Sequence, residues 1–295
     1  MSERLCLLSV HAHPDDEASK GPATVAKYHH QGVRTVLVCC TGGEEGDILN
    51  PAMDLPEVRA DIASVRRREL ATAADIIGYD EVVHLGYRDS GMADTPQNEH
   101  PDCFARADLD EAVARLVAVV RRERPQVVIT YGEDQHSYPH PDHIRVHEVS
   151  VAAFAAAGDA AAYPGGGEPW QPLKLYYSGW SGARILAMHE KFEELGLESP
   201  FDEGWRERAA ASSADYTTVI DVAGFTDVRR SALLAHATQV DPTSPFWFGL
   251  PPEVARTIHP IDEYELARSL VPARPPDAGD IEDDLFAGVR DLAAR

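Results

Sequence analysis

Histidine and carboxylate side chains gather in two short segments of this 295-residue chain. Residues 11–17 (HAHPDDE) hold two imidazoles and three carboxylates, and residues 138–147 (YPHPDHIRVH) add three more histidines. A hydrolytic zinc site needs about three nitrogen or oxygen ligands from the protein and an open position for water. The two segments together supply these groups, so the sequence predicts a metal-dependent hydrolase.

The first segment also has a plainer interpretation. An acidic loop that caps a helix is common, and Asp15, Asp16 and Glu17 fit one. His13, two residues before them, and the distant second cluster of histidines favour a metal site instead. Because adjacent Asp15 and Asp16 cannot easily point the same way, they suit a division between metal ligand and general base.

The second segment offers several possible ligands. His143 and His147 are four residues apart, so they would share one face of a helix. His140 precedes Pro141, which places it in a loop or at the helix start. Spacing alone leaves open which of these three histidines binds the metal.

Both segments follow predicted strands, and this fixes where the site should lie. Apolar runs predict strands at residues 5–10, 34–40, 81–87, 126–132 and 173–180. Helical patterns alternate with them at residues 18–32, 54–78, 109–124 and 144–157. This alternation indicates an α/β fold, a Rossmann-like and mostly parallel sheet with helices on both faces. Ligands of such sheets bind at the carboxyl ends of the strands.

The remainder of the chain is less regular. Helical patterns at residues 183–196 and 227–239 are joined by loops rich in proline and glycine, and no internal repeat is evident. We therefore expect a single hydrolase domain over residues 1–295. It would comprise an α/β core (1–180) and a C-terminal elaboration of helices and loops (181–295).

Composition excludes several classes of partner. The formal net charge of −22 disfavours nucleic acid and anionic membranes. Four cysteines show no CxxC spacing, and Cys6, Cys39 and Cys40 lie in apolar runs, which indicates buried free thiols. No apolar stretch approaches the roughly 18 residues of a membrane span, and HAHPDDE interrupts the short apolar run near the N-terminus. These features predict a soluble, cytoplasmic protein.

The two motifs together resemble those of the PIG-L/LmbE-like deacetylase superfamily, whose members are zinc-dependent and hydrolyse N-acyl groups on glucosamine-containing substrates. The likeness runs nearly end to end through DEASKG, TGGEEGDILNPAMDLPEV, LGYRDSG, YPHPDHIRVHEVSVAAF, HATQVDP and ELARSLVPARPP. Within the superfamily these stretches are most similar to amidases that act on thiol conjugates. The resemblance implies one Zn²⁺ per chain, with Fe²⁺ as an alternative, and a small-molecule thiol conjugate as partner. The resemblance is compatible with a homo-oligomer.

The resemblance also implies roles for individual residues. The implied zinc ligands are His13, Asp16 and His143. The implied catalytic groups are Asp15 as general base, His140 as general acid, Asp142, which orients His140, and Tyr138, which helps to polarise the carbonyl. The implied substrate contacts are Arg66 and Asp89, which hold inositol or sugar hydroxyls, and Lys20, which confers specificity.

One segment departs from the family pattern. Gln135 and His136 stand where the family has an Asn-Gly-Gly-like stretch, which would change the pocket rim. The expected activity is cleavage of a cysteinyl–glucosamine amide in thiol detoxification, which releases a mercapturic acid and glucosaminyl-inositol. The alternatives are an N-acetylglucosaminyl-inositol deacetylase, a paralogue in a sulfur-containing antibiotic pathway, and a conjugate-binding module without catalysis.

Overall fold

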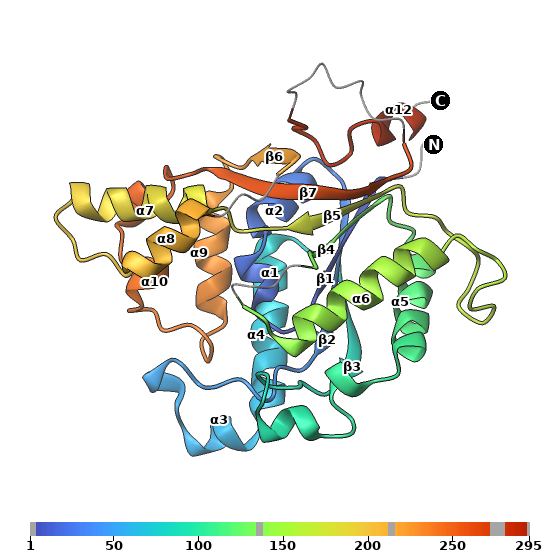
Figure 1. Cartoon of the computed structure of the whole chain (residues 1–295), viewed down its shortest axis with the longest axis horizontal. Coiled ribbons are helices and arrows are strands. Elements are labelled where there is room, and N and C mark those ends of the chain that lie inside the picture. Colours follow the sequence, from blue (N-terminus) through green and yellow to red (C-terminus); the bar gives the residue numbers. More distant parts are fainter. Residues whose placement is uncertain (1–3, 134–137, 212–215, 272–280, 294–295) are drawn as a thin grey trace.

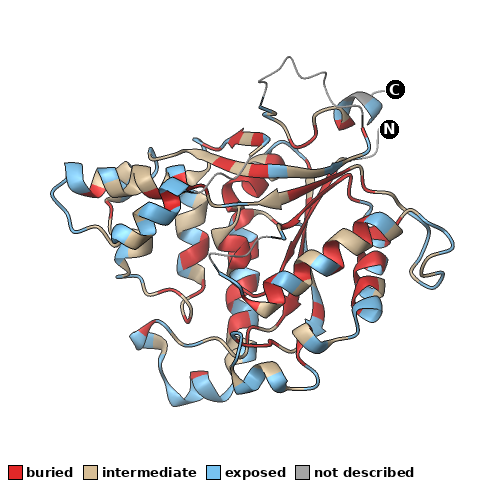
Figure 2. Cartoon of the chain, in the orientation of Figure 1, coloured by how far each residue is buried: buried red, intermediate tan, exposed pale blue. Residues whose placement is uncertain are grey.

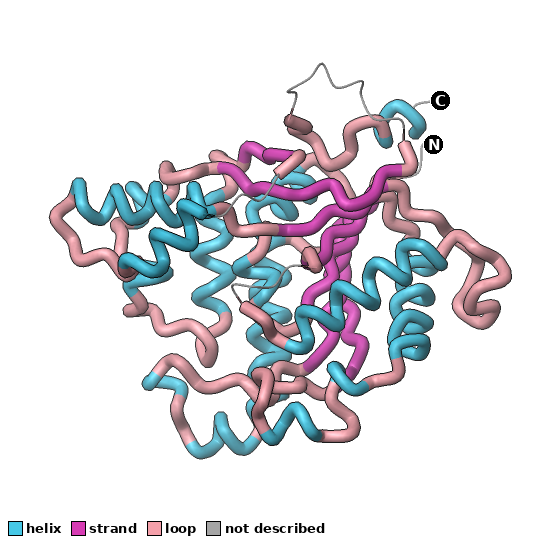
Figure 3. Tube along the Cα trace, in the orientation of Figure 1, coloured by secondary structure: helices cyan, strands magenta, loops and turns pink. Residues whose placement is uncertain are grey.

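A computed structural model describes residues 4–133, 138–211, 216–271 and 281–293. Within these residues a seven-stranded sheet has the order β3-β2-β1-β4-β5-β7-β6 (Figures 1 and 3). The strands are β1 Cys6–His11, β2 Arg34–Thr41, β3 Glu81–Tyr87, β4 Val127–Tyr131, β5 Lys174–Ser178, β6 Thr218–Asp221 and β7 Ile261–Ser269. β1 to β5 are parallel, and β7 is antiparallel to β5 and β6. The predicted mostly parallel α/β fold is confirmed.

Helices cover both faces of this sheet (Figure 1). The helices of the described chain are α1 Asp16–Ser19, α2 Pro22–His30, α3 Pro56–Ala60, α4 Ile62–Ile77, α5 Leu109–Glu123, α6 Pro141–Ala156, α7 Gly182–Glu194, α8 Glu203–Ala211, α9 Thr226–Ala235, α10 Pro245–Phe248, α11 Pro252–Ala255 and α12 Val289–Ala293. Short 3₁₀ helices span Pro51–Met53, Pro96–Glu99 and Phe104–Arg106. None of the helices among these described residues is long and apolar enough to cross a bilayer.

The central strands form the interior of the molecule, as Figure 2 shows. Every residue of β1 and β4 is buried, which fits apolar strands covered on both faces. Alternate residues of β1 enter opposite layers. Leu7 belongs to the apolar cluster that contains Leu70 of α4, and Leu8 to the cluster that contains Leu116 of α5. The predicted free thiols Cys6, Cys39 and Cys40 are buried and unbridged.

Two stretches predicted as single helices are broken in the structure. Residues 18–32 divide into α1 and α2 because Gly21 has a positive φ of 78° and Pro22 begins a new helix. A Cβ at position 21 would lie 2.4 Å from the Tyr264 hydroxyl, so no larger residue fits. Residues 54–78 divide into α3 and α4 at Asp61. The first break leaves α1 as a separate short helix that carries Asp16.

The C-terminal part contributes two strands that the sequence analysis did not predict. β7 pairs with β5 and β6 and extends the sheet beyond the parallel core. Its buried positions include Asp262 and Tyr264. A buried aspartate breaks the apolar alternation by which a strand is recognised. Asp262 accepts hydrogen bonds from the amide and hydroxyl of Thr24 in α2 at 3.2 and 2.9 Å, and this joins β7 to the core.

Candidate metal centre

The two histidine-rich segments meet at the carboxyl ends of neighbouring strands. β1 pairs with β2 on one side and with β4 on the other, so the strand order reverses at β1. Such a reversal leaves a crevice beyond the strand ends, where α/β proteins bind ligands. The loop and α1 that follow β1 supply residues 12–19, and α6, which follows β4, supplies the histidines of the second motif.

His13, Asp16 and His143 form a compact group of ligand atoms. One such atom from each lies within 4.8 Å of the others, and all three residues are buried. The two oxygens of Asp16 lie 3.5 Å from His13 Nδ1 and 3.4 Å from His143 Nε2. The buried Nε2 of His143 has no hydrogen-bond partner. A divalent ion would satisfy that nitrogen, so this donor set fits zinc.

The protonation of the two histidines suits a metal ligand set. Burial lowers the pKa of His143 to about 4, so its nitrogen lone pair is free. Burial also disfavours the charged form of His13, but the carboxylates of Asp142, Asp16 and Asp89 outweigh this and raise its pKa well above the usual value. Because a metal binds neutral imidazole, binding here would displace a proton from His13.

A second group of possible ligands lies beside the first and comprises His13, Asp89, His140 and Asp142. Its carboxylates are already engaged by the protein. Asp142 accepts hydrogen bonds from the Ser90 amide at 3.0 Å and from His13 Nε2 at 3.1 Å. Asp89 accepts the Gly91 amide at 2.9 Å. These bonds orient His13, as carboxylates commonly orient a metal-binding histidine. The first group, whose His143 Nε2 has no hydrogen-bond partner, is therefore the better candidate to hold a metal ion.

Asp15 lies beside the metal group in a constrained backbone conformation. Its φ is 116°, which is unusual for a residue with a side chain. Arg66 Nη2 donates to the Asp15 carboxylate at 3.1 Å and to the Pro14 carbonyl at 2.6 Å. Burial raises the pKa of Asp15 while the Arg66 guanidinium opposes the rise. A raised carboxylate pKa approaches the range that suits a general base.

Glu17 and His236 form a buried carboxylate–imidazole pair next to Asp15. Glu17 accepts the Asp15 amide through Oε2 at 2.9 Å and contacts His236 Nε2 through Oε1 at 2.5 Å. Both Glu17 and His236 side chains are fully buried. Sequence reasoning missed this pair, because His236 lies 219 positions from Glu17 and nothing in its local pattern indicates a partner.

His140 and Tyr138 border the group on the α6 side. His140 is the N-cap of α6, and its Nδ1 accepts the Asp142 amide at 3.2 Å. Burial lowers the pKa of His140 to about 4, and His13 adds to the effect. The Tyr138 ring packs against His140 and His143, with centroid separations of 5.8 and 5.2 Å. Tyr138 is half exposed, so it is the member of this set nearest to solvent.

Three residues expected to contact substrate are engaged by the protein itself. Lys20 Nζ donates to Asp16 Oδ1 at 2.5 Å, at the edge of the metal group. Arg66 is buried, and its Nη1 donates to the carbonyl of Gly43. Asp89 is buried and lies 3.5 Å from His13 Nε2. In this structure these three side chains contact residues of the metal group or the backbone next to it.

His147 lies outside the metal group. His147 Nδ1 contacts the Tyr131 carbonyl at 3.0 Å and is absent from both groups of possible ligands found among the described residues. The same Tyr131 packs its ring against His143 at a centroid separation of 4.6 Å. Gln135 and His136, expected at the pocket rim, fall outside the described residues.

Comparison with known proteins shows which family the chain belongs to. Residues 8–154 match the PIG-L family model, described as GlcNAc-PI de-N-acetylase. The chain belongs to the PIG-L family and is a hydrolase that acts on amide C–N bonds. It is 44% identical to the mycothiol S-conjugate amidase of Streptomyces coelicolor, over 99% of this chain and 100% of the relative.

Two further comparisons concern deacetylases, one by sequence and one by fold. The chain is 40% identical to a 1D-myo-inositol 2-acetamido-2-deoxy-α-D-glucopyranoside deacetylase of Streptomyces scabiei, over 96% of this chain and 89% of the relative. Its fold is similar to that of the N,N'-diacetylchitobiose deacetylase of Pyrococcus horikoshii. That match has a TM-score of 0.60 and 15% identity and covers 88% and 83% of the two chains.

Proposed function

We propose that this protein is a zinc-dependent amidase that hydrolyses the cysteinyl–glucosamine amide of mycothiol S-conjugates. The products are an N-acetylcysteine S-conjugate and glucosaminyl-inositol. Near-complete coverage at 44% identity with a mycothiol S-conjugate amidase supports the substrate. The observation that supports metal-dependent chemistry is that His13, Asp16 and His143 lie close together, and that the buried Nε2 of His143 has no hydrogen-bond partner.

The residues around the metal group suit the steps of amide hydrolysis. A bound zinc ion would polarise the amide carbonyl and lower the pKa of water towards about 7. Asp15, with its raised pKa, takes the proton of the attacking water. Tyr138, half exposed beside His140 and His143, donates a hydrogen bond to the developing oxyanion.

His140 supplies the proton for the departing amine. Its lowered pKa makes the protonated ring a minor species but a strong acid, which gives up its proton readily. Its Nδ1 faces the Asp142 amide, which leaves Nε2 as the nitrogen that can meet the substrate. Asp142 thus contacts His140 through its backbone and His13 through its carboxylate.

The alternative function is deacetylation of acetylglucosaminyl-inositol, which relatives with 40% identity favour. The two activities share one site and differ in the acyl group removed. We would measure kcat/KM for a bimane conjugate of mycothiol and for the acetylated sugar with the same metal-assayed enzyme. A higher value for the conjugate supports the amidase. A higher kcat/KM for the acetylated sugar would instead identify the protein as the deacetylase.

A further inference from the structure

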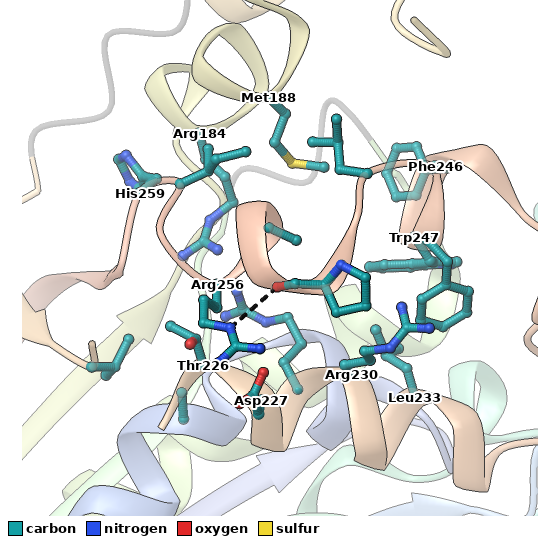
Figure 4. Close-up of a pocket in the computed structure, with 18 of the residues that line it drawn as sticks. Arg184, Met188, Thr226, Asp227, Arg230, Leu233, Phe246, Trp247, Arg256 and His259 are labelled. Carbon is teal, nitrogen blue, oxygen red and sulfur yellow. Dashed lines mark hydrogen bonds between the residues drawn. The ribbon is translucent and has the colours of Figure 1, made fainter. Parts of the chain in front are cut away.

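A second hollow lies in the C-terminal part of the molecule, apart from the metal group. α7, α9, α10 and α11 surround it, together with Trp180, which follows β5. Figure 4 shows Phe246 and Trp247 on one side and Arg184 and His259 on the other. The proposed mechanism uses none of these side chains. We call this hollow, lined by aromatic rings and arginines, the arginine–aromatic pocket.

Flat aromatic surfaces form one wall of the pocket. The rings of Trp180 and Phe246 are parallel within 1°, with centroids 5.9 Å apart. Trp247 stands at 87° to both rings. All three side chains are only partly buried, although each presents a large apolar face. An apolar or aromatic group in the hollow would bury surface on each ring.

The pocket also has more positive than negative charge, in a chain whose net charge is −22. Four arginines line it, against the single carboxylate of Asp227. Arg184 and Arg229 share one carboxylate, that of Asp262, at 3.2 and 2.6 Å. Burial and the neighbouring Arg229 lower the pKa of Arg184 to about 10. The site therefore favours an added negative charge.

Two of the arginines are available to a ligand. Arg230 lies over the ring of Phe248 at 4.6 Å, and Arg256 Nε donates to the Pro252 carbonyl at 3.4 Å. Within the part of the chain that the structure describes, neither forms an ion pair. Figure 4 shows both guanidinium groups at the hollow that Trp247 borders. A carboxylate could accept hydrogen bonds from either group.

The pocket is connected to the metal centre through its aromatic wall. The Trp180 indole N–H donates to the Ser19 carbonyl at 3.0 Å. Ser19 ends α1, the helix that begins with Asp16. With a rise of about 1.5 Å per residue, α1 separates these two residues by only about 5 Å along its axis. The aromatic wall of the pocket therefore contacts the short helix that carries Asp16.

We propose that the arginine–aromatic pocket binds the acid product of the reaction, an N-acetylated cysteine with an apolar group on sulfur. This inference rests on the proposed amidase function. Hydrolysis breaks the amide C–N bond, adds the hydroxyl of water to the carbonyl carbon and returns a proton to the sugar amine. The neutral amide thereby becomes a carboxylate on an apolar thioether. This product carries one negative charge and an apolar group. The pocket offers the complementary features, which are positively charged arginines and apolar aromatic rings.

The test is equilibrium binding of S-benzyl-N-acetylcysteine to metal-free protein, measured by calorimetry. We expect S-benzyl-N-acetylcysteine amide, which lacks the charge, to bind about tenfold more weakly. The double variant Arg230→Ala/Arg256→Ala should lose about the same factor for the acid. The matched control is Arg67→Ala/Arg68→Ala, which removes two exposed arginines of α4 and should bind the acid normally.

Three results would overturn the proposal: equal binding of acid and amide, undiminished binding by the Arg230/Arg256 variant, or loss of binding in His143→Ala. The variant His143→Ala locates the bound acid, because binding in the pocket survives that change and binding at the metal centre does not. Since these titrations need no turnover, they are independent of the substrate comparison. An enzyme that cleaves only the acetylated sugar would refute the amidase function even if it binds the acid.

Discussion

Asp15 is held at the metal centre from two directions. Arg66 contacts its carboxylate and Glu17 accepts its backbone N–H. Its φ of 116° carries a conformational cost that these contacts must offset. Asp15 makes no ligand contact in the group of His13, Asp16 and His143. Its proposed role is therefore proton transfer, separate from metal binding.

The variant Asp15→Ala tests this separation. We expect kcat to fall by about 10²–10⁴, because a positioned general base is lost, while the metal content remains that of the wild type. Turnover and metal analysis of the same preparation provide the measurement. Asp102→Ala, which removes an exposed carboxylate, is the control. Near-native turnover in Asp15→Ala would refute the assignment of the base.

Glu17 is expected to act on turnover through Asp15. Glu17→Ala removes the acceptor of the Asp15 amide and the partner of buried His236. We expect kcat to fall about 10- to 100-fold with little change in KM, because the fully buried Glu17 cannot touch substrate. Glu17→Gln keeps one acceptor oxygen and should restore part of the rate. A rise in KM alone would contradict this positioning role.

The motifs predicted residues that lie together in the structure. They did not predict how these residues contact one another. Spacing left His140, His143 and His147 as equal candidates, and the start of α6 at Pro141 gives each of them a different place. His140 becomes the N-cap, while His147 lies one turn beyond His143 and contacts Tyr131. The pairing of Glu17 with His236 depends on the packing of α9 against the core, which no local pattern encodes.

At the scale of elements, one buried aspartate ties the C-terminal strands to the core. Asp262 of β7 binds Thr24 of α2, Arg184 of α7 and Arg229 of α9. Burial alone would raise the pKa of Asp262, but Arg229 and Arg184 outweigh burial and hold it below the usual range. Its contribution to stability is therefore present above the unfolded pKa of about 3.9 and lost as the pH falls through the lower folded pKa.

Asp262→Asn should consequently destabilise the protein in a pH-dependent way. At pH 7 we expect the free energy of unfolding to fall by about 3–5 kcal/mol, because two partly buried arginines lose the buried carboxylate that they share. The difference from the wild type should shrink below about pH 4 as Asp262 of the wild type becomes protonated. Urea unfolding at both pH values measures it, with Asp75→Asn on the surface of α4 as control. A pH-independent difference would contradict the argument.

The elements themselves were predictable to different degrees. The five parallel strands are short segments rich in apolar residues, and the sequence analysis located all of them. Gly21 and Asp61 interrupt helices that apolar periodicity predicts as continuous, because periodicity does not register a single backbone conformation. β7 was missed because its buried face holds Asp262, whose burial depends on arginines from two other elements.

At the scale of the whole molecule, the reversal of strand order at β1 creates the site. It brings the loop after β1 beside α6, so that His13 contacts Asp142 across 129 positions of the chain. The candidate metal centre therefore depends on the pairing of β1 with β4 and not on either motif alone. A bound ion would in turn join the two loops and stabilise the folded state.

The most direct test of this account is the metal content of three purified proteins, measured by inductively coupled plasma mass spectrometry. We predict about one zinc ion per chain in the wild type and in His147→Ala, whose altered histidine lies one helical turn beyond the site. His143→Ala, folded but without the unpartnered Nε2, should retain less than about a tenth of that metal. Full metal occupancy in His143→Ala would contradict the assignment of the centre.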